Sequence, residues 1–167
     1  RFPEHAWSLR FHADRLEGKT VPSLESMDRC LRSIVEIEML LDEIYARSPF
    51  AAAATLAPPS TPGILRQYAR RSRIDGSLQP WSLCLPENYD PARRYGLVLC
   101  LRGDDEDEFE AAGKLVPARA GDFIIAAPWG RGSWGFASFG EEDVLEVLDD
   151  VQRRYSVDPD RIYLAGW

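Results

Sequence analysis

Two adjacent residues of this sequence, Gly166 and Trp167, match the start of a motif that carries a reactive serine. In the motif G-x-S-x-G a strand turns sharply into a helix, and the turn exposes the Ser hydroxyl at the edge of a sheet. Gly166 takes the place of the first glycine and Trp167 that of the second position. We therefore expect a nucleophilic Ser directly after Trp167. The preceding residues of the segment 158–167, D-P-D-R-I-Y-L-A-G-W, would supply the strand that leads into the turn.

A second segment that could take part in chemistry is rich in glycine and aromatic residues. Residues 130–135 spell G-x-G-x-x-G, a pattern with which dinucleotide-binding proteins hold a pyrophosphate at the start of a helix. Here the next helix is expected to start only near Glu141, too far away for its dipole to reach a phosphate. We favour a substrate-facing loop in which Trp129, Trp134 and Phe136 line an acyl or aromatic pocket. Packing of these side chains beneath the loop is an equally good alternative.

These segments need a scaffold that brings them together, and the hydrophobic pattern predicts one. A hairpin would turn at Asp75-Gly76, a dipeptide typical of tight turns, and Pro80 predicts an edge position or a bulge in its second strand. The order of elements predicts an α/β fold, an antiparallel hairpin followed by parallel strands with crossover helices. The expected strands are 68–74, 78–85, 97–101, 123–127 and 162–165, and the expected helices are 106–113 and 141–155.

Parallel strands end at the same edge of a sheet, and ligands bind beyond that edge. Residues 102–110, 128–140 and 166–167 should therefore converge there. The first of these segments carries six acidic residues in a short run, which are Asp104, Asp105, Glu106, Asp107, Glu108 and Glu110. Selection of a cationic substrate group, or a cation site, is one interpretation of this run. We favour a solvated loop and helix start, because charged runs usually face water.

The first third of the chain follows another pattern. Apolar residues spaced by three and four predict a helix that begins at Ser23 and stops before Pro49, so we expect a helical N-terminal segment over residues 1–47. Residues 48–63 are rich in Ala and Pro and are expected to form a stiff linker. The main domain would then cover residues 64–167. We expect the N-terminal helix to pack on this domain, with homo-oligomerisation through residues 23–47 as an alternative.

Composition narrows the range of partners. A formal charge of −7 argues against a nucleic-acid partner, which usually selects basic patches, and no apolar run reaches the roughly 20 residues of a membrane span. Cys30, Cys84 and Cys100 form no C-x-x-C pair and are expected to be buried thiols of a protein in a reducing, cytoplasmic compartment. His5 and His12 lack the spacing of a zinc site. We expect neither a metal nor another cofactor.

In its second half the chain resembles the α/β-hydrolase superfamily, above all bacterial esterases of the feruloyl-esterase and polyhydroxybutyrate-depolymerase kind and prolyl-oligopeptidase-like peptidases. The order and spacing of five phrases carry the resemblance: D-G-S-L-Q-P-W-S-L-C-L-P-E-N-Y-D-P (75–91), Y-G-L-V-L-C-L-R-G (95–103), A-P-W-G-R-G (127–132), G-E-E-D-V-L-E-V-L-D-D-V (140–151) and D-P-D-R-I-Y-L-A-G-W (158–167). Residues 64–167 would form the first half of such a domain, which ends just before the nucleophile.

The resemblance implies a serine hydrolase that cleaves ester or peptide bonds. One oxyanion-hole donor would come from the loop Arg102-Gly103-Asp104, where Gly103 lets the backbone approach a substrate and the Asp104 N–H is the candidate donor. Arg102 stands where the family usually has His, and it could instead pair with the neighbouring acids. Trp129, Arg131, Trp134 and Trp167 are the candidate substrate-binding residues. The His and the acid of a Ser-His-Asp/Glu triad would lie in the C-terminal half of the domain, beyond residue 167.

The substitution of Arg102 for His leaves a second hypothesis open. The protein could be a binding or scaffolding protein on a hydrolase-like fold that has lost catalysis. The residue after Trp167 distinguishes the two, since a Gly or Ala there would favour the scaffold and a Ser the hydrolase.

Overall fold

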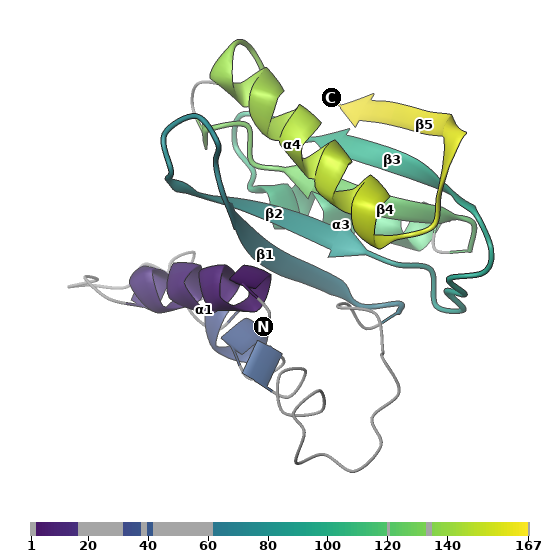
Figure 1. Cartoon of the computed structure of the whole chain (residues 1–167), viewed down its shortest axis with the longest axis horizontal. Coiled ribbons are helices and arrows are strands. Elements are labelled where there is room, and N and C mark those ends of the chain that lie inside the picture. The colour runs from purple at the N-terminus through teal and green to yellow at the C-terminus, as the bar shows by residue number, and fades with distance from the viewer. Residues whose placement is uncertain are drawn as a thin grey trace.

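The computed structural model describes residues 3–16, 32–37, 40–41, 62–119, 121–132 and 135–166. The fold is built around a five-stranded sheet in the order β1-β2-β4-β3-β5, with helices on both faces (Figure 1). This mixed architecture confirms the predicted α/β fold. The elements are α1 (Pro3–Leu16), β1 (Leu65–Arg71), β2 (Leu78–Cys84), β3 (Tyr95–Leu101), α3 (Glu108–Arg119), β4 (Phe123–Pro128), α4 (Phe139–Arg154) and β5 (Val157–Gly166).

β1 and β2 form the predicted hairpin, paired antiparallel in one unbroken register. The turn needs Gly76, whose φ of 71° suits glycine better than other residues. Asp75 fixes the turn, because its Oδ1 accepts hydrogen bonds from the backbone N–H of Ser77 at 3.0 Å and from its hydroxyl at 2.6 Å. Pro80 lies in an inner strand, but β4 pairs with β2 only from Trp81 onward. Pro80 therefore occupies a local edge, where its missing N–H costs no hydrogen bond.

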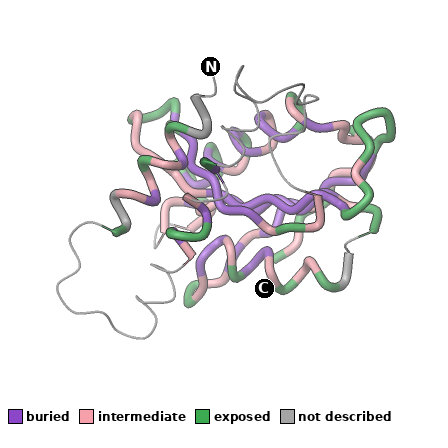
Figure 2. Tube along the Cα trace, turned by 90° about the horizontal axis from the view of Figure 1, so that it is seen from below, coloured by how far each residue is buried: buried purple, intermediate pink, exposed green. Residues whose placement is uncertain are grey.

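The remaining strands are parallel, and their two faces are covered by different helices. β3 pairs with β4 on one side and with β5 on the other. Ile124 and Ala126 of β4 pack in the larger apolar cluster with side chains of α4, whereas Ile125 and Ala127 pack in a smaller cluster with alanines of α3. Figure 2 shows the resulting buried strands between exposed outer layers. Both crossover helices were predicted, although α3 continues to Arg119, past the expected end at residue 113.

Helix α1 and the helical residues 32–37 lie along the outer edge of β1. The hydroxyl of Ser8 accepts the Ala69 N–H at 3.0 Å, and the ring Nε2 of His12 donates to the Gln67 carbonyl oxygen at 3.2 Å. Glu36 accepts the Gln67 N–H at 3.1 Å. Outward-facing backbone groups of the edge strand thus bond to side chains of the N-terminal helices in place of a further strand.

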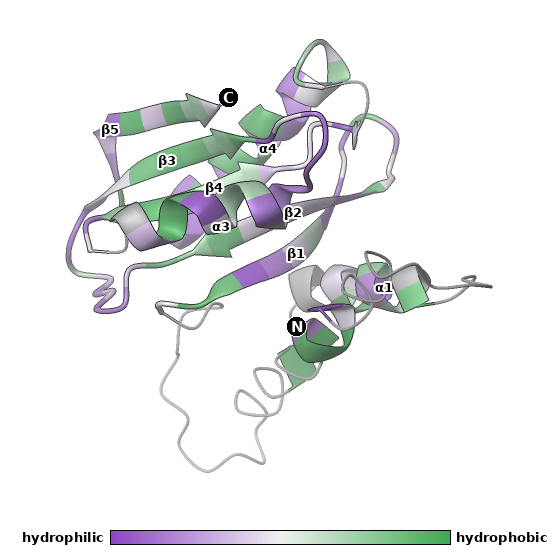
Figure 3. Ribbon diagram, turned by 180° about the vertical axis from the view of Figure 1, so that it is seen from behind, coloured by the Kyte–Doolittle hydropathy of each residue, from purple (hydrophilic) through white to green (hydrophobic). Residues whose placement is uncertain are grey.

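β1 is also unusual in the side chains that it buries. Arg66 and Arg70 have 0% and 4% of their surface exposed, although strands of this kind usually bury apolar residues. The Nε of Arg66 donates to Glu36 at 2.8 Å, and the Nε of Arg70 donates to Asp150 of α4 at 3.1 Å. Arg70 also forms an ion pair with Glu146. Figure 3 shows the contrast, with β1 largely hydrophilic and β3 hydrophobic along its length.

The N-terminal predictions are only partly covered by the structure. α1 was not predicted, because residues 1–22 show no helical apolar stripe. Of the helix expected over 23–47, the described residues 32–37 and 40–41 are helical. Nearly all of the expected linker, residues 48–61, lies outside the described residues. No helix in the described part of the chain is long and apolar enough to cross a membrane.

Candidate active site

The carboxyl ends of β3, β4 and β5 lie on one edge of the sheet. Leu101, the last residue of β3, is opposite Gly166, the last residue of β5, in the parallel register. β4 runs parallel to β3 on its other side and ends at Pro128. The loops that follow β3 and β4 therefore begin beside the end of β5, as the sequence predicted for these three segments.

Arg102 joins the two loops. Its guanidinium donates hydrogen bonds to three backbone carbonyl oxygens: that of Trp129 at 2.9 Å, that of Gly103 at 2.7 Å, and that of Gly132. The same guanidinium stacks on the Trp129 ring, with its carbon 4.5 Å from the centroid of the ring. Only 8% of Arg102 is exposed. The sequence allowed an ion pair with the neighbouring acids instead, but the partners of Arg102 are backbone carbonyl groups on both loops.

The loop after β3 contains backbone N–H groups with and without an acceptor. The Gly103 N–H donates to Oε1 of Glu106 at 2.9 Å. Within the described residues the Asp104 N–H has no acceptor, and the residue is exposed. The Asp104 N–H is thus available to a ligand at this edge, and its part as an oxyanion donor stays a prediction. The part played by Glu106 could not be predicted, because this residue is one of several acids in the run.

The acidic run divides into exposed and structural members. Asp104 and Asp105 are exposed, as expected for a solvated loop. Asp107 caps α3, because its Oδ1 accepts the Glu110 N–H at 2.8 Å and its own N–H donates to Glu110 at 2.9 Å. Glu108, in contrast, is only 1% exposed and accepts a hydrogen bond from the Gln67 side chain. The expectation of a helix start is confirmed, but that of full solvation is wrong for Asp107 and Glu108.

Arg131, a candidate substrate-binding residue, braces the scaffold behind the loop. Its guanidinium lies 2.7 Å from Asp75 in the hairpin turn and 2.9 Å from Asp143 in α4, and it donates to the hydroxyl of Ser72 at 2.6 Å. Its backbone adopts φ of 62°, which is uncommon for a residue with a side chain. These contacts tie the hairpin to α4, and direct contact with a substrate stays a prediction.

Two of the three glycines of the loop 130–135, Gly130 and Gly132, are closely packed against the protein itself, whereas a Cβ at Gly135 would meet no atom within 4 Å. A Cβ at Gly130 would lie 2.4 Å from the Phe136 ring, and one at Gly132 would lie 3.2 Å from the Trp129 ring. α4 begins at Phe139, after the last glycine of the pattern, and its first turn carries Glu141 and Glu142. Both carboxylates would repel a phosphate at this helix end. The arrangement does not favour the dinucleotide interpretation.

The aromatic residues of the expected pocket are only partly described. Trp134 and Trp167 lie outside the described residues, and Trp129 packs against Arg102 on one face. A cavity of about 290 Å³ lies beside the glycine-rich loop, lined by Asp75, Arg131 and residues 137–139. Phe139, on its wall, is 55% exposed. The wall of this cavity thus carries an exposed aromatic ring, that of Phe139, near the sheet edge where the loops meet.

Of the other candidate groups, Cys100 lies one residue before the end of β3 but is fully buried, and His12 and Cys84 lie elsewhere in the fold. His12 lies in α1 against β1, and Cys84 and Cys100 are buried free thiols. Burial raises the pKa of both thiols to about 11, so they are poor nucleophiles near neutral pH. Among the described residues no group of three or more His, Cys, Asp or Glu side chains is placed to hold a metal ion.

Comparison with known structures identifies the fold. A thermostable esterase aligns with 61% of this chain at 20% identity with a TM-score of 0.52, and the aligned part is 34% of that esterase. A ferulic acid esterase from Anaeromyces mucronatus (17% identity, TM-score 0.46) and the fluorophosphonate-binding serine hydrolase F of Staphylococcus aureus (18%, 0.47) align with 62% and 63% of this chain, and with 48% and 47% of their own.

No protein-family model matches the sequence, and no curated protein matches it. The likeness to the thermostable esterase shows that the chain has an α/β-hydrolase-like fold, as the sequence predicted. The chain spans about a third of the length of that esterase.

Proposed function

We propose that this chain forms the first half of a serine hydrolase domain that cleaves carboxylic ester or peptide bonds. The observation that carries the proposal is the parallel pairing of β5 with β3, which sets Gly166 opposite Leu101. The residue after Trp167 would then emerge beside the loop 102–104, where a Ser hydroxyl could attack a carbonyl carbon held near the Asp104 N–H. The likeness to an esterase supports this choice of chemistry, and it makes simple esters the first substrates to try.

In this proposal the Asp104 N–H binds the oxyanion that forms when the carbonyl is attacked. Its lack of an acceptor among the described residues supports the assignment, as does the Glu106 carboxylate that holds the preceding N–H. A second N–H would come from the residue after the nucleophile. Arg102 holds the loop in place through its three carbonyl acceptors, so it acts on the substrate only indirectly.

A His and an Asp or Glu in the C-terminal half of the domain would complete the triad. The exposure of β5 supports the presence of such a half. Tyr163 and Leu164 point to opposite faces of the sheet, yet they are 49% and 67% exposed. Side chains of this kind are normally covered in a central strand, and we propose that a further strand and helices pack on β5. Trp129, Arg131, Trp134 and Trp167 would then border the substrate pocket, with Phe139 on its rim.

A fluorophosphonate probe tests the nucleophile directly, because it forms a covalent adduct only with an activated serine. The full-length protein is incubated with the probe, digested and analysed by mass spectrometry. We expect one adduct, on the residue directly after Trp167. Labelling of a different serine, or none in protein that hydrolyses esters, would show that the nucleophile is elsewhere.

The oxyanion donor is tested by removing a single N–H. Asp104→Pro deletes the donor, and Asp104 is not among the described residues with a positive φ, which proline could not adopt. We expect kcat to fall about 100-fold or more, the usual loss for one oxyanion-hole donor. Asp104→Asn is the matched control, since it removes the charge but keeps the N–H, and its kcat should stay close to that of the wild type. Equal losses in both variants would assign the effect to the side chain.

The structure gives no reason to prefer the non-catalytic scaffold. That hypothesis arose from Arg102 in the place of His. Arg102 orders the two loops at the sheet edge, so its presence is compatible with a working site.

A further inference from the structure

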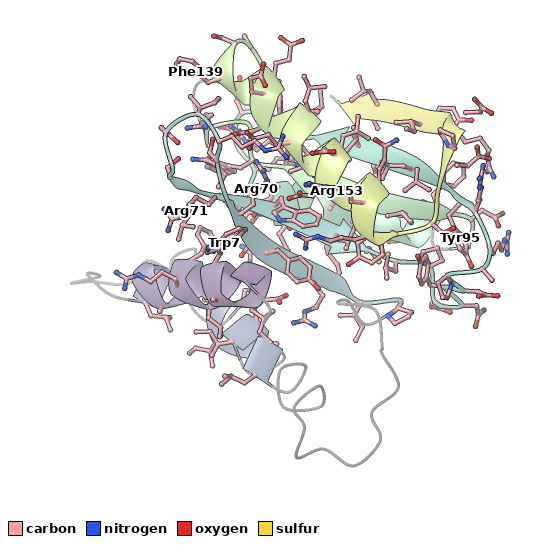
Figure 4. The ribbon with its side chains drawn as sticks, viewed as in Figure 1. Trp7, Arg70, Arg71, Tyr95, Phe139 and Arg153 are labelled. Atoms are coloured by element: carbon pink, nitrogen blue, oxygen red, sulfur yellow. The ribbon has the colours of Figure 1, made fainter. Side chains whose placement is uncertain are left out.

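A second, basic cleft lies outside the candidate active site. It has a volume of about 480 Å³ and is bounded by α1, the end of β1 with the turn that follows, and the last turns of α4. Figure 4 labels four of its lining residues on these three elements. Five arginines and one tryptophan are among its lining residues, which are Trp7, Arg70, Arg71, Ser72, Arg73, Asp150, Arg153 and Arg154. None of them belongs to the loops after β3 and β4.

The cleft carries more positive than negative charge. Three carboxylates, those of Glu146, Asp149 and Asp150, are paired with four of its five arginines. Among the described residues these three acids leave two of the five positive charges without a compensating carboxylate. This excess is local, because the whole chain has a formal charge of −7. A basic cleft in a protein of net negative charge is a candidate site for an anionic ligand.

The carboxylates hold part of the arginine cluster in position. Asp149 lies 2.7 Å from Arg73 and 3.3 Å from Arg153, so one acid fixes guanidinium groups from the hairpin and from α4. Arg71 and Arg154 retain donors for a ligand. Arg71 is exposed and donates through one nitrogen to the Gly76 carbonyl oxygen at 2.6 Å, and Arg154 comes no closer than 3.9 Å to Asp150. A guanidinium group has five N–H donors, and among the described residues only one acceptor is found for those of Arg71 and none within hydrogen-bond distance for those of Arg154.

We propose that this cleft binds a phosphate compound that carries at least two negative charges. The planar guanidinium fork matches the oxygens of a phosphate in a bidentate manner, and two uncompensated positive charges match a dianion or a more highly charged ligand. The volume falls in the range of small-molecule sites and exceeds that of a single phosphate. Trp7 supplies a flat apolar surface on which the ring of an organic phosphate can stack.

Titration calorimetry of the full chain at low ionic strength tests the site, with inorganic pyrophosphate and ADP as probes. We expect saturable binding of at least one probe. Arg71→Gln and Arg154→Gln should each weaken it about tenfold, the effect of losing one charge-assisted contact. Arg94→Gln is the control, because it removes the same charge from an exposed residue outside the cleft, and it should change the affinity less than about twofold.

The two probes distinguish the source of the phosphate. Tighter binding of ADP, with the difference lost in Trp7→Leu, assigns the cleft to a ring-bearing phosphate, whereas equal binding assigns it to the phosphate groups alone. Melting curves of each variant report whether it is folded, and either arginine variant alone suffices for the comparison. The proposal is overturned if neither probe shows saturable binding at millimolar concentration, or if Arg94→Gln weakens binding as much as the cleft variants do.

Discussion

Replacing Arg102 by Lys should destabilise the protein although the charge is kept. The guanidinium donates to three carbonyl oxygens and stacks on Trp129 at 4.5 Å. The ammonium group of Lys is compact and not planar, so it cannot donate to both loops at once or stack on the Trp129 ring. Losing two hydrogen bonds of about 1 to 1.5 kcal/mol each gives an expected loss of about 2 to 3 kcal/mol.

Urea unfolding of the full chain measures this loss. With an unfolding slope of about 2 kcal/mol per molar urea, the midpoint should fall by about 1 to 1.5 M. Arg94→Lys, at an exposed position, is the control and should stay within about 0.5 kcal/mol of the wild type. The account of Arg102 as the brace between the two loops fails if Arg102→Lys is as stable as this control.

Three further results are expected. Gly140→Ala should destabilise by about 1 to 3 kcal/mol, because the added Cβ would lie 1.8 Å from the Gly135 carbonyl oxygen; Gly121→Ala, whose Cβ meets no atom within 4 Å, should be neutral in the same unfolding experiment. Cys84 and Cys100, with pKa values near 11, should resist iodoacetamide at pH 8 in native protein and react in urea; fast native labelling would contradict their burial. Hydrogen bonds from Ser77, aided by Arg131, lower the pKa of Asp75 to about 2. The contribution of Asp75 to stability should therefore be complete above about pH 4 and disappear as the pH falls toward 2. Asp75→Asn should abolish that part of the acid dependence, and an Asp75 carboxyl that titrates near 4 by NMR would refute the shift.

The sheet was predictable because its strands carry strong local signals. The run L-V-L-C-L in β3 and the run F-I-I-A-A in β4 are apolar at every position, since helices cover both faces of these strands. Asp75-Gly76 fixed the hairpin, and the stripe of α4 pointed its apolar side at the larger cluster. The order of these elements along the chain then determined which loops meet at the sheet edge.

α1 escaped prediction for a physical reason. Its fully buried side chains are the polar ones of Ser8 and His12, both hydrogen-bonded to β1, and Leu9 packs against the core only partly buried, so no apolar stripe marks the face that packs. The same holds for β1, whose buried Arg66 and Arg70 are balanced by acids that are distant in sequence. A pattern of hydrophobic residues cannot reveal a contact in which each buried charge depends on a partner that only the fold supplies.

The candidate site shows a similar division. Its position followed from strand order, but the parts played by its charged residues did not. Arg102 and Arg131 lie in loops that any ligand would approach, and the N–H groups of both side chains bond to other parts of the protein and hold those loops in place. Glu106 is indistinguishable in sequence from its acidic neighbours, yet its carboxylate accepts the Gly103 N–H and so makes that donor unavailable to a ligand.

The side chains that seal the edge of β1 have a consequence for solubility. An open edge strand can recruit the strand of another molecule and so nucleate aggregation. Here Ser8, His12 and Glu36 occupy the N–H and carbonyl groups through which such recruitment would begin. A truncated form that keeps the sheet but lacks these helices would present a bare template, and self-association of that form would come from the lost cover even with the apolar core intact.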